Sequence, residues 1–176
     1  MGYLLASPLR RLIHSPKSIL SPFVNAGMTV LEPGPGMGFF TLDLARMVGP
    51  SGRVIAVDTQ PKMLASLKRR AARKGLLDRM DLRLAQPESM GLADVTAKVD
   101  FALAFAVVHE MPSSKVFFEE TARALRQSGT LLLAEPSGHV NVPAFEGELK
   151  DAARAGLSLT ARPEVPRSFA ALLTKA

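Results

Sequence analysis

The chain contains no cysteine, and this absence removes several kinds of chemistry. Disulfide bonds, thiolate ligands for metal ions and cysteine nucleophiles are all excluded within these 176 residues. Long hydrophobic runs are absent as well, because none approaches the roughly 20 residues that a membrane-spanning helix needs. No long apolar stretch follows Arg10 and Arg11, so we identify no signal peptide. We therefore expect a cytoplasmic protein with no membrane span.

Repeats, low-complexity runs and long linkers are also missing from the sequence. A length of 176 residues fits one domain with a single buried core, and a hydrophobic fraction of 47% is that of an ordinary globular protein. We therefore expect residues 1–176 to form a single domain. Within it, residues 1–25 would be a lead-in or lid segment, because Arg10, Arg11, His14 and Lys17 form a basic stretch that could fold over a site.

The net charge of +6 is concentrated in one part of the chain. Residues 61–83 carry eight basic and two acidic side chains, which equals the whole excess. Such a patch could attract phosphate or nucleic acid. The simpler interpretation is a solvated helix face, which we favour.

Strand-like and helix-like segments alternate along the chain, which indicates a parallel α/β sheet. Residues 99–105 are a continuous apolar run, typical of a strand buried on both faces. Only a short connection joins the last two strands, and this predicts an antiparallel hairpin. The expected strands are about 28–33, 53–58, 80–85, 99–105, 130–135, 157–162 and 168–174, and the expected helices about 38–48, 61–74, 112–126 and 142–155. We therefore expect an α/β fold: a Rossmann-like, seven-stranded, mostly parallel sheet with a C-terminal antiparallel hairpin and helices on both faces.

A glycine-rich turn follows the first expected strand. Gly34, Gly36 and Gly38 stand at alternate positions, and glycine lets a backbone come close to a ligand because it lacks a Cβ atom and tolerates positive φ. Glu32 lies where this strand ends, and the second strand ends in Asp58. Strand, glycine turn, helix, strand and terminal acid are the layout of a nucleotide-cofactor half-site. The spacing G-x-G-x-G differs, however, from the dinucleotide fingerprint G-x-G-x-x-G.

Five segments in order resemble the class I S-adenosylmethionine-dependent methyltransferases, especially the small-molecule branch. The resemblance extends from about residue 25 to the end of the chain. It rests on the segments Glu32–Gly38, Asp58, Gln86–Glu88, Ala104–Glu110 and Leu125–Pro136. It implies that S-adenosylmethionine is the cofactor and that the chain is an enzyme.

The resemblance also implies where the cofactor binds. Backbone N–H groups of the turn would bind its carboxylate, and Asp58 would accept hydrogen bonds from the ribose hydroxyls. Glu32 would either support the turn or receive the amino group. Gln86 stands where the family usually has an acid, so either Gln86 or Glu88 contacts the adenine. The expected cofactor-binding residues are Glu32, Pro33, Gly34, Gly36, Gly38, Asp58, Thr59, Met63, Gln86, Pro87, Glu88, Ala104 and Phe105.

His109 and Glu110 are the candidate catalytic residues, because they follow a central strand at its carboxyl end, where ligands bind in open α/β sheets. His109 could act as a general base, or it could pack beneath the cofactor or cap the next helix. Further candidates to face the substrate are His14, His139 and Glu135. No metal site is expected.

The acceptor is indicated only by weak signals. The apolar segment Ala104–Val107 replaces the Asn-Pro-Pro-Tyr type of motif found in many nucleic-acid and protein amino-methylating members, which favours a small or lipid-like acceptor. The missing cysteines argue against arsenic methylation. The alternatives are an RNA or protein methyltransferase that uses the basic 62–83 surface, and a non-catalytic cofactor-binding or partner subunit. A homo-oligomer that closes an open site is a further expectation.

Overall fold

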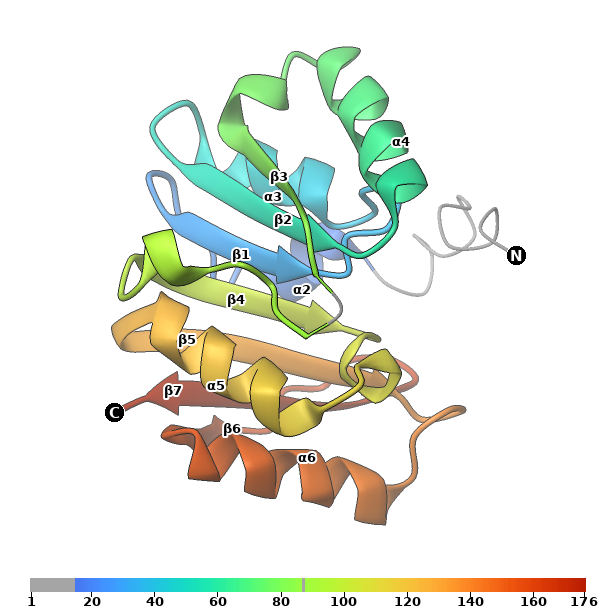
Figure 1. The fold of residues 1–176 in the computed structure, drawn as a ribbon, viewed down its shortest axis with the longest axis vertical. Helices are drawn as coiled ribbons and strands as arrows, with labels where there is room; N and C mark the ends of the chain where they lie inside the picture. Colours follow the sequence, from blue (N-terminus) through green and yellow to red (C-terminus); the bar gives the residue numbers. More distant parts are fainter. Residues whose placement is uncertain (1–14, 87) are drawn as a thin grey trace. The chain divides into compact units, whose positions relative to one another are not determined.

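The computed structural model describes residues 15–86 and 88–176 (Figure 1). The chain divides into two compact units, Met1–Ala85 and Gln86–Ala176, and each is described by itself. The expectation of a single domain stays a prediction. The basic residues Arg10, Arg11 and His14 lie outside the described residues, so the same holds for the lid segment.

The first unit is a parallel three-stranded arrangement with helices. Its strands follow the order β3-β2-β1, with Val30 opposite Val54 and Val54 opposite Met80. Leu31 and Ile55 are buried in neighbouring strands, as expected for a sheet covered on both faces. Its elements are α2 (Pro16–Leu20), β1 (Thr29–Pro33), α3 (Thr41–Val48), β2 (Arg53–Asp58), α4 (Pro61–Ala72), η2 (Leu77–Arg79) and β3 (Met80–Leu84).

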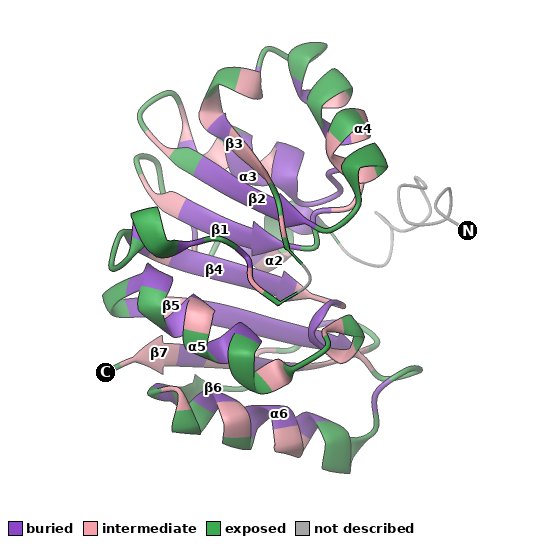
Figure 2. Ribbon diagram, viewed as in Figure 1, coloured by how far each residue is buried: buried purple, intermediate pink, exposed green. Residues whose placement is uncertain are grey.

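Helix α4 carries four of the eight basic residues of the segment 61–83, and Lys62, Lys68 and Arg69 are on its exposed side (Figure 2). Pro61 lies in its first turn, where the missing N–H group has no intrahelical partner to lose. Leu67 and Ala71 are the buried residues of α4, so only a narrow stripe packs on the unit. Gly75 follows with a φ of +62° and allows the chain to leave the helix.

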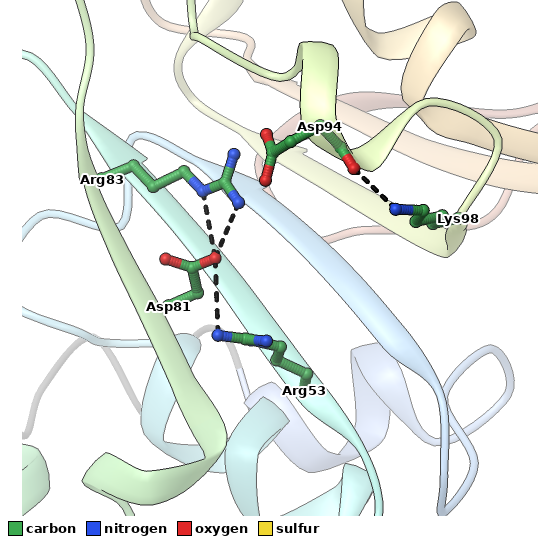
Figure 3. A network of polar contacts seen from close by, with 5 residues as sticks. All are labelled: Arg53, Asp81, Arg83, Asp94 and Lys98. Carbon is green, nitrogen blue, oxygen red and sulfur yellow. Dashed lines mark hydrogen bonds and ion pairs between the residues drawn. The ribbon is translucent and has the colours of Figure 1, made fainter.

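Two arginines of the first unit approach the carboxylate of Asp81 in β3 (Figure 3). The Nη2 atom of Arg83 lies 2.8 Å from Oδ2 of Asp81, and Nη2 of Arg53 lies 3.7 Å from the same oxygen. Arg83 belongs to the basic segment, so one of the eight basic side chains of that segment is paired with a carboxylate within the unit. Figure 3 also shows Lys98 of the second unit, whose Nζ donates to the carbonyl oxygen of Asp94 at 2.7 Å.

The second unit combines parallel and antiparallel strands in the order β4-β5-β7-β6. Strand β5 pairs in parallel with β4 and antiparallel with β7, and β7 pairs antiparallel with β6. The predicted terminal hairpin is therefore confirmed, with β7 between β5 and β6. The elements are η3 (Ala93–Val95), β4 (Val99–Phe105), η4 (Val108–Glu110), α5 (Ser114–Ala124), β5 (Leu125–Pro136), α6 (Val142–Arg154), β6 (Leu157–Ala161) and β7 (Ser168–Lys175).

The predicted fold class is confirmed: seven strands, mostly parallel, with antiparallel C-terminal strands. Two boundaries differ from expectation by three residues or more. Helix α3 begins at Thr41 rather than near residue 38, because the glycine turn continues through Gly38 with a φ of +84°. Strand β5 begins at Leu125, five residues early, and its register with β4 shifts between Val99 and Phe101. Ser128 lies between the expected helix 112–126 and the expected strand 130–135, where a turn would connect them, but it is an irregularity inside β5 with a φ of +59°.

Candidate functional site

The glycine turn between β1 and α3 is built from residues with positive φ. Gly34, Gly36 and Gly38 have φ values of +67°, +54° and +84°, which glycine adopts without the steric penalty of a Cβ atom. The N–H group of Gly34 donates to the carbonyl of Val57 at 2.8 Å, and that of Gly38 donates to the carbonyl of Pro35 at 2.9 Å. The first bond joins the turn to β2, and the second closes the turn on itself.

The glycines of this turn differ in what surrounds them. A Cβ atom at Gly36 would have no atom within 4 Å, so the turn faces open space at this point. A Cβ atom at Gly38 would lie 2.5 Å from Cδ1 of Leu67 in α4. Gly36 therefore leaves room for a ligand, whereas Gly38 allows the turn and α4 to pack closely.

Asp58 links the end of β2 to the glycine turn. Its Oδ2 atom accepts a hydrogen bond from the N–H group of Gly36 at 3.2 Å, and Oδ1 accepts one from Gln60 at 2.8 Å. The side chain is 8% exposed. A carboxylate accepts about four hydrogen bonds in all, so it can hold the turn and also accept from hydroxyls of a ligand. The structure thus brings together two residues that are 22 positions apart in the sequence.

An arginine that the sequence analysis did not assign to the site also fixes the turn. Arg70 of α4 donates from Nη1 to the carbonyl oxygen of Met37. Only the position of Arg70 on the inner edge of α4 could have suggested this contact, because the basic run around it is exposed as a whole.

The other predicted cofactor residues are placed as follows. Glu32 is buried in β1, Thr59 is exposed, and Met63 is half-buried in the first turn of α4. In the second unit, Ala104 is buried in β4. Pro33 ends β1, and Gly34 begins the turn. Phe105 is half-buried at the end of β4. Gln86 and Glu88 are exposed, and Pro87 lies outside the described residues.

His109 lies in η4, directly after β4, and its partner is Glu135. The Nδ1 atom of His109 is hydrogen-bonded to Oε2 of Glu135, which ends the buried part of β5. Oε1 of Glu135 accepts the N–H groups of Val107 and Val108 at 3.1 and 2.8 Å. Glu135 has no exposed surface, so one buried carboxylate joins the loop after β4 to β5.

Sequence analysis grouped His109 with Glu110, and the structure adds the closer carboxylate. Oε1 of Glu110 lies 4.0 Å from Nε2 of His109, and the Glu110 side chain is 74% exposed. His139 contacts the ring of His109 edge-on at 5.8 Å between centroids. The signal for Glu135 was available, because neighbouring parallel strands have their carboxyl ends at the same edge of a sheet.

A second buried carboxyl lies on α6. The pKa of Glu148 is raised to about 7, chiefly by burial and to a smaller extent by the nearby charges of Glu135 and Asp151. Within the described part of the chain, Oε2 of Glu148 has no hydrogen-bond partner. A hydrogen bond from Ser114 instead lowers the pKa of Asp151. Glu148 is thus protonated at acidic pH in the folded protein and becomes charged near neutrality.

This carboxyl predicts a pH-dependent gain in stability for the variant Glu148→Gln. A carboxyl whose folded pKa lies above its unfolded value of 4.5 makes the wild-type protein less stable as pH rises from about 4.5 to about 7. We expect Glu148→Gln to be more stable than wild type by about 1 kcal/mol at pH 8, and to gain little at pH 4.5, because solvent screens part of the effect. Urea unfolding at both pH values measures this. An equal gain in stability at both pH values would contradict a raised pKa of Glu148 as the cause.

Residues 15–86 and 88–176 contain neither a candidate metal cluster nor a helix that could span a membrane. No three His, Asp or Glu side chains of these residues are grouped as metal ligands would be, and none of their helices has the length and apolarity that crossing a bilayer requires.

The second unit has a pocket of about 560 Å³ beside the start of β7. Phe169 lines this pocket and is the register partner of Glu135 in β5. The pocket therefore adjoins the strand end that carries the carboxylate of the His109–Glu135 pair. Its lining combines charged and apolar side chains, from Arg162 to Ala170.

Comparison with known proteins gives a family profile and several related sequences. A family profile described as a methyltransferase domain matches residues 24–164. The arsenite methyltransferase of Halobacterium salinarum is 32% identical over 109 residues, which are 62% of this chain and 27% of that protein. The demethylmenaquinone methyltransferase of Lactobacillus johnsonii is 29% identical over 118 residues, 67% of this chain and 48% of that protein. The chain thus spans between about a quarter and a half of the length of these curated relatives.

A solved structure agrees in fold over the whole chain. The crystal structure of a SAM dependent methyltransferase from Aquifex aeolicus superposes with a TM-score of 0.87 at 26% identity, and the match covers 99% of this chain and 97% of that one. The family profile covers most of the chain, and the glycine turn with Asp58 has the geometry of a nucleotide-cofactor site. The chain therefore belongs to the class I S-adenosylmethionine-dependent methyltransferases, enzymes that use S-adenosylmethionine as cofactor.

Proposed function

We propose that this enzyme transfers the methyl group of S-adenosylmethionine to a small-molecule acceptor. The cofactor part of this proposal rests on the hydrogen bond between Asp58 and Gly36. This bond joins the acid at the end of β2 to the turn after β1. The residues fit the cofactor, because a Cβ atom at Gly36 would project into the open space in front of the turn.

The chain's own residues would bind and orient, with few of them taking part in chemistry. Asp58 accepts from two ribose hydroxyls, and the backbone of the turn donates to a carboxylate. Thr59 and Met63 flank the adenine, and Gln86 or Glu88 contacts its edge. When bound, the cofactor supplies a methyl group activated by a sulfonium. Alignment of the acceptor with that group provides most of the acceleration, since proximity and orientation alone are worth several orders of magnitude.

His109 would act as the general base for the acceptor. It lies at the carboxyl end of β4, and its Nε2 atom is on the side of the exposed Glu110, away from Glu135. Imidazole is suited to this role because its pKa is ordinarily close to the working pH. Glu110 would be a second, weaker contributor through its charge.

Two observations support a small acceptor. An open pocket of about 560 Å³, lined by Phe169, adjoins the end of β5 that carries Glu135. Relatives include a demethylmenaquinone methyltransferase, whose name states a small-molecule acceptor. Arsenite, the acceptor named for another relative, fits this chain poorly, because no cysteine is present to supply a thiolate.

The basic surface of α4 supports an RNA acceptor as the second candidate. Lys62, Lys68, Arg69, Arg73 and Lys74 are exposed there. Three other basic residues of the segment are engaged within the unit, namely Arg70 with Met37, Arg79 with the carbonyl of Ala45, and Arg83 with Asp81. This division weakens the RNA candidate, because only part of the charge is presented.

Neutralising this surface distinguishes the candidates. We expect Lys68→Gln with Arg69→Gln and Arg73→Gln to leave small-molecule methylation within about twofold of wild type. An RNA methyltransferase would instead lose binding to a mixed RNA pool and show a reduced salt dependence of that binding, because fewer phosphate contacts would form. The variant Lys98→Gln, with a single charge removed from the second unit, is the control.

Two measurements test the proposal itself. Calorimetry with S-adenosylmethionine and S-adenosylhomocysteine should give saturable binding, and its absence at millimolar cofactor with folded protein would refute the function. Transfer of a tritiated methyl group is then measured with menadiol, catechol and glycine as probes. Labelling of an added RNA pool, with none of the three small probes labelled, would favour the RNA candidate.

The homo-oligomer expected from the sequence is tested by sedimentation velocity.

A further inference from the structure

Every oxygen of the Glu135 carboxylate is engaged by groups of the second unit. Oε1 receives two backbone N–H groups, from Val107 and Val108, and Oε2 faces Nδ1 of His109. The residue before this pair, Ala106, has a φ of +56°, and its N–H group donates to the carbonyl of Ala134 at 2.8 Å. The left-handed backbone at Ala106 thus turns the loop so that the next three residues meet one carboxylate.

This arrangement determines where a neutral imidazole carries its proton. A carboxylate oxygen only accepts, so the ring atom that faces it must donate. Nδ1 of His109 therefore bears the hydrogen, and Nε2 has a free lone pair. The ring is 19% exposed, and the carboxylate nearest to Nε2 is that of Glu110 at 4.0 Å, which is too far for a hydrogen bond.

We propose that Glu135 is a positioning residue that holds neutral His109 in the Nδ1–H tautomer, with Nε2 ready to accept a proton. Taken with the proposed function, on which this part rests, the acceptor is a molecule that must lose a proton when it is methylated. The acceptor's X–H bond breaks and an Nε2–H bond forms, while the X–C bond forms and the S–C bond breaks. Glu135 keeps its negative charge and stabilises the imidazolium that results.

The surroundings of Glu135 are consistent with this role. Besides His109, the groups that face the pair are Glu148 from α6, His139 from the loop after β5, and Glu110 from η4. The raised pKa of Glu148, about 7, keeps that side chain largely uncharged below neutrality. Below about pH 7, a second negative charge is therefore avoided beside the Glu135 carboxylate. At every pH, the N–H groups of Val107 and Val108 stabilise the charge of Glu135.

The variant Glu135→Gln tests the tautomer directly. The two N–H groups of Val107 and Val108 require an acceptor, so the amide oxygen will take the place of Oε1. The amide NH₂ will then face Nδ1 of His109 and donate to it. We expect the proton of the neutral ring to move from Nδ1 to Nε2, which removes the lone pair that the base needs. In a serine protease, the equivalent change from carboxylate to amide lowers kcat about 10⁴-fold by the same reversal.

Nitrogen-15 NMR of imidazole-labelled protein at pH 8.5 gives the readout without any acceptor. The chain has three histidines, so His14→Gln and His139→Gln variants assign the signals. Wild type is expected to show His109 protonated at Nδ1, and Glu135→Gln at Nε2. Glu148→Gln, which alters a buried carboxyl that does not contact the ring, is the control and should leave the tautomer unchanged.

Two results would overturn the proposal: an Nε2–H tautomer in wild type, or an unchanged tautomer in folded Glu135→Gln. If Glu135→Gln does not fold, the wild-type spectrum alone decides. Failure of the proposed function is seen separately, in the calorimetry with S-adenosylmethionine, because the residues assigned to ribose and carboxylate binding belong to the first unit.

Discussion

The variant Asp58→Ala is expected to bind S-adenosylmethionine at least about 100-fold more weakly than wild type. Each hydrogen bond to a charged acceptor contributes about 1.5–3 kcal/mol, and about 1.4 kcal/mol corresponds to a factor of ten. Loss of two ribose contacts is therefore expected to lower the affinity for the cofactor by more than two orders of magnitude. The substitution also removes the acceptor for the N–H groups of Gly36 and Gln60, so the turn itself becomes less ordered. Calorimetric titration with the cofactor measures the effect.

A matched surface acid separates ribose binding from a general effect of charge. Asp43 of α3 is paired with Arg46 at 2.7 Å on the outside of the same unit, and Asp43→Ala should bind the cofactor within twofold of wild type. The variant Asp58→Asn retains one acceptor oxygen, so its affinity for the cofactor should lie between those of Asp58→Ala and Asp43→Ala. Wild-type affinity in a folded Asp58→Ala protein would mean that the ribose is held elsewhere.

The parts of the fold that the sequence determines locally were predicted well. Strands β2 and β4 have the predicted bounds, because each is a short apolar run with a clear end. The start of α3 was placed three residues early, since periodicity does not reveal that Gly38 still has a positive φ. The early start of β5 was missed because pairing with β4 and β7 overrides the turn signal of Ser128 and Gly129.

The candidate site shows the same division between local and long-range information. Asp58 could be predicted because its position after a strand and its distance from the turn are properties of the sequence. The contact of Arg70 with Met37 depends on how α4 packs, 33 residues away, and no local pattern encodes it. The pairing of His109 with Glu135 spans 26 residues and needs the parallel register of β4 and β5, so the neighbour Glu110 was the partner suggested by sequence alone.

Alanine substitution at two glycines of the turn is expected to lower stability by different amounts. Gly38→Ala is expected to lower the free energy of unfolding by about 2–4 kcal/mol. Roughly 1–2 kcal/mol comes from the left-handed backbone, and the rest from overpacking, because the new Cβ atom would lie 2.5 Å from Cδ1 of the buried Leu67. Gly36→Ala meets no atom within 4 Å and should cost only the backbone part, about 1–2 kcal/mol. Urea unfolding of both variants measures the difference.

A double-mutant cycle with Leu67→Ala identifies the clash as the cause. Leu67→Ala leaves a cavity and costs about 2–5 kcal/mol alone, but it makes room for the new methyl group. In that background Gly38→Ala should cost no more than Gly36→Ala, so the two substitutions at positions 38 and 67 will be strongly non-additive. Additive effects would mean that backbone strain alone explains the cost of Gly38→Ala.

Cofactor affinity is expected to fall more in Gly36→Ala than in Gly38→Ala. The methyl group at position 36 projects into the space that the ligand needs, whereas the one at position 38 points into the packed interior of the unit. A folded Gly36→Ala protein with unchanged cofactor affinity would contradict the assignment of the turn as the cofactor cradle.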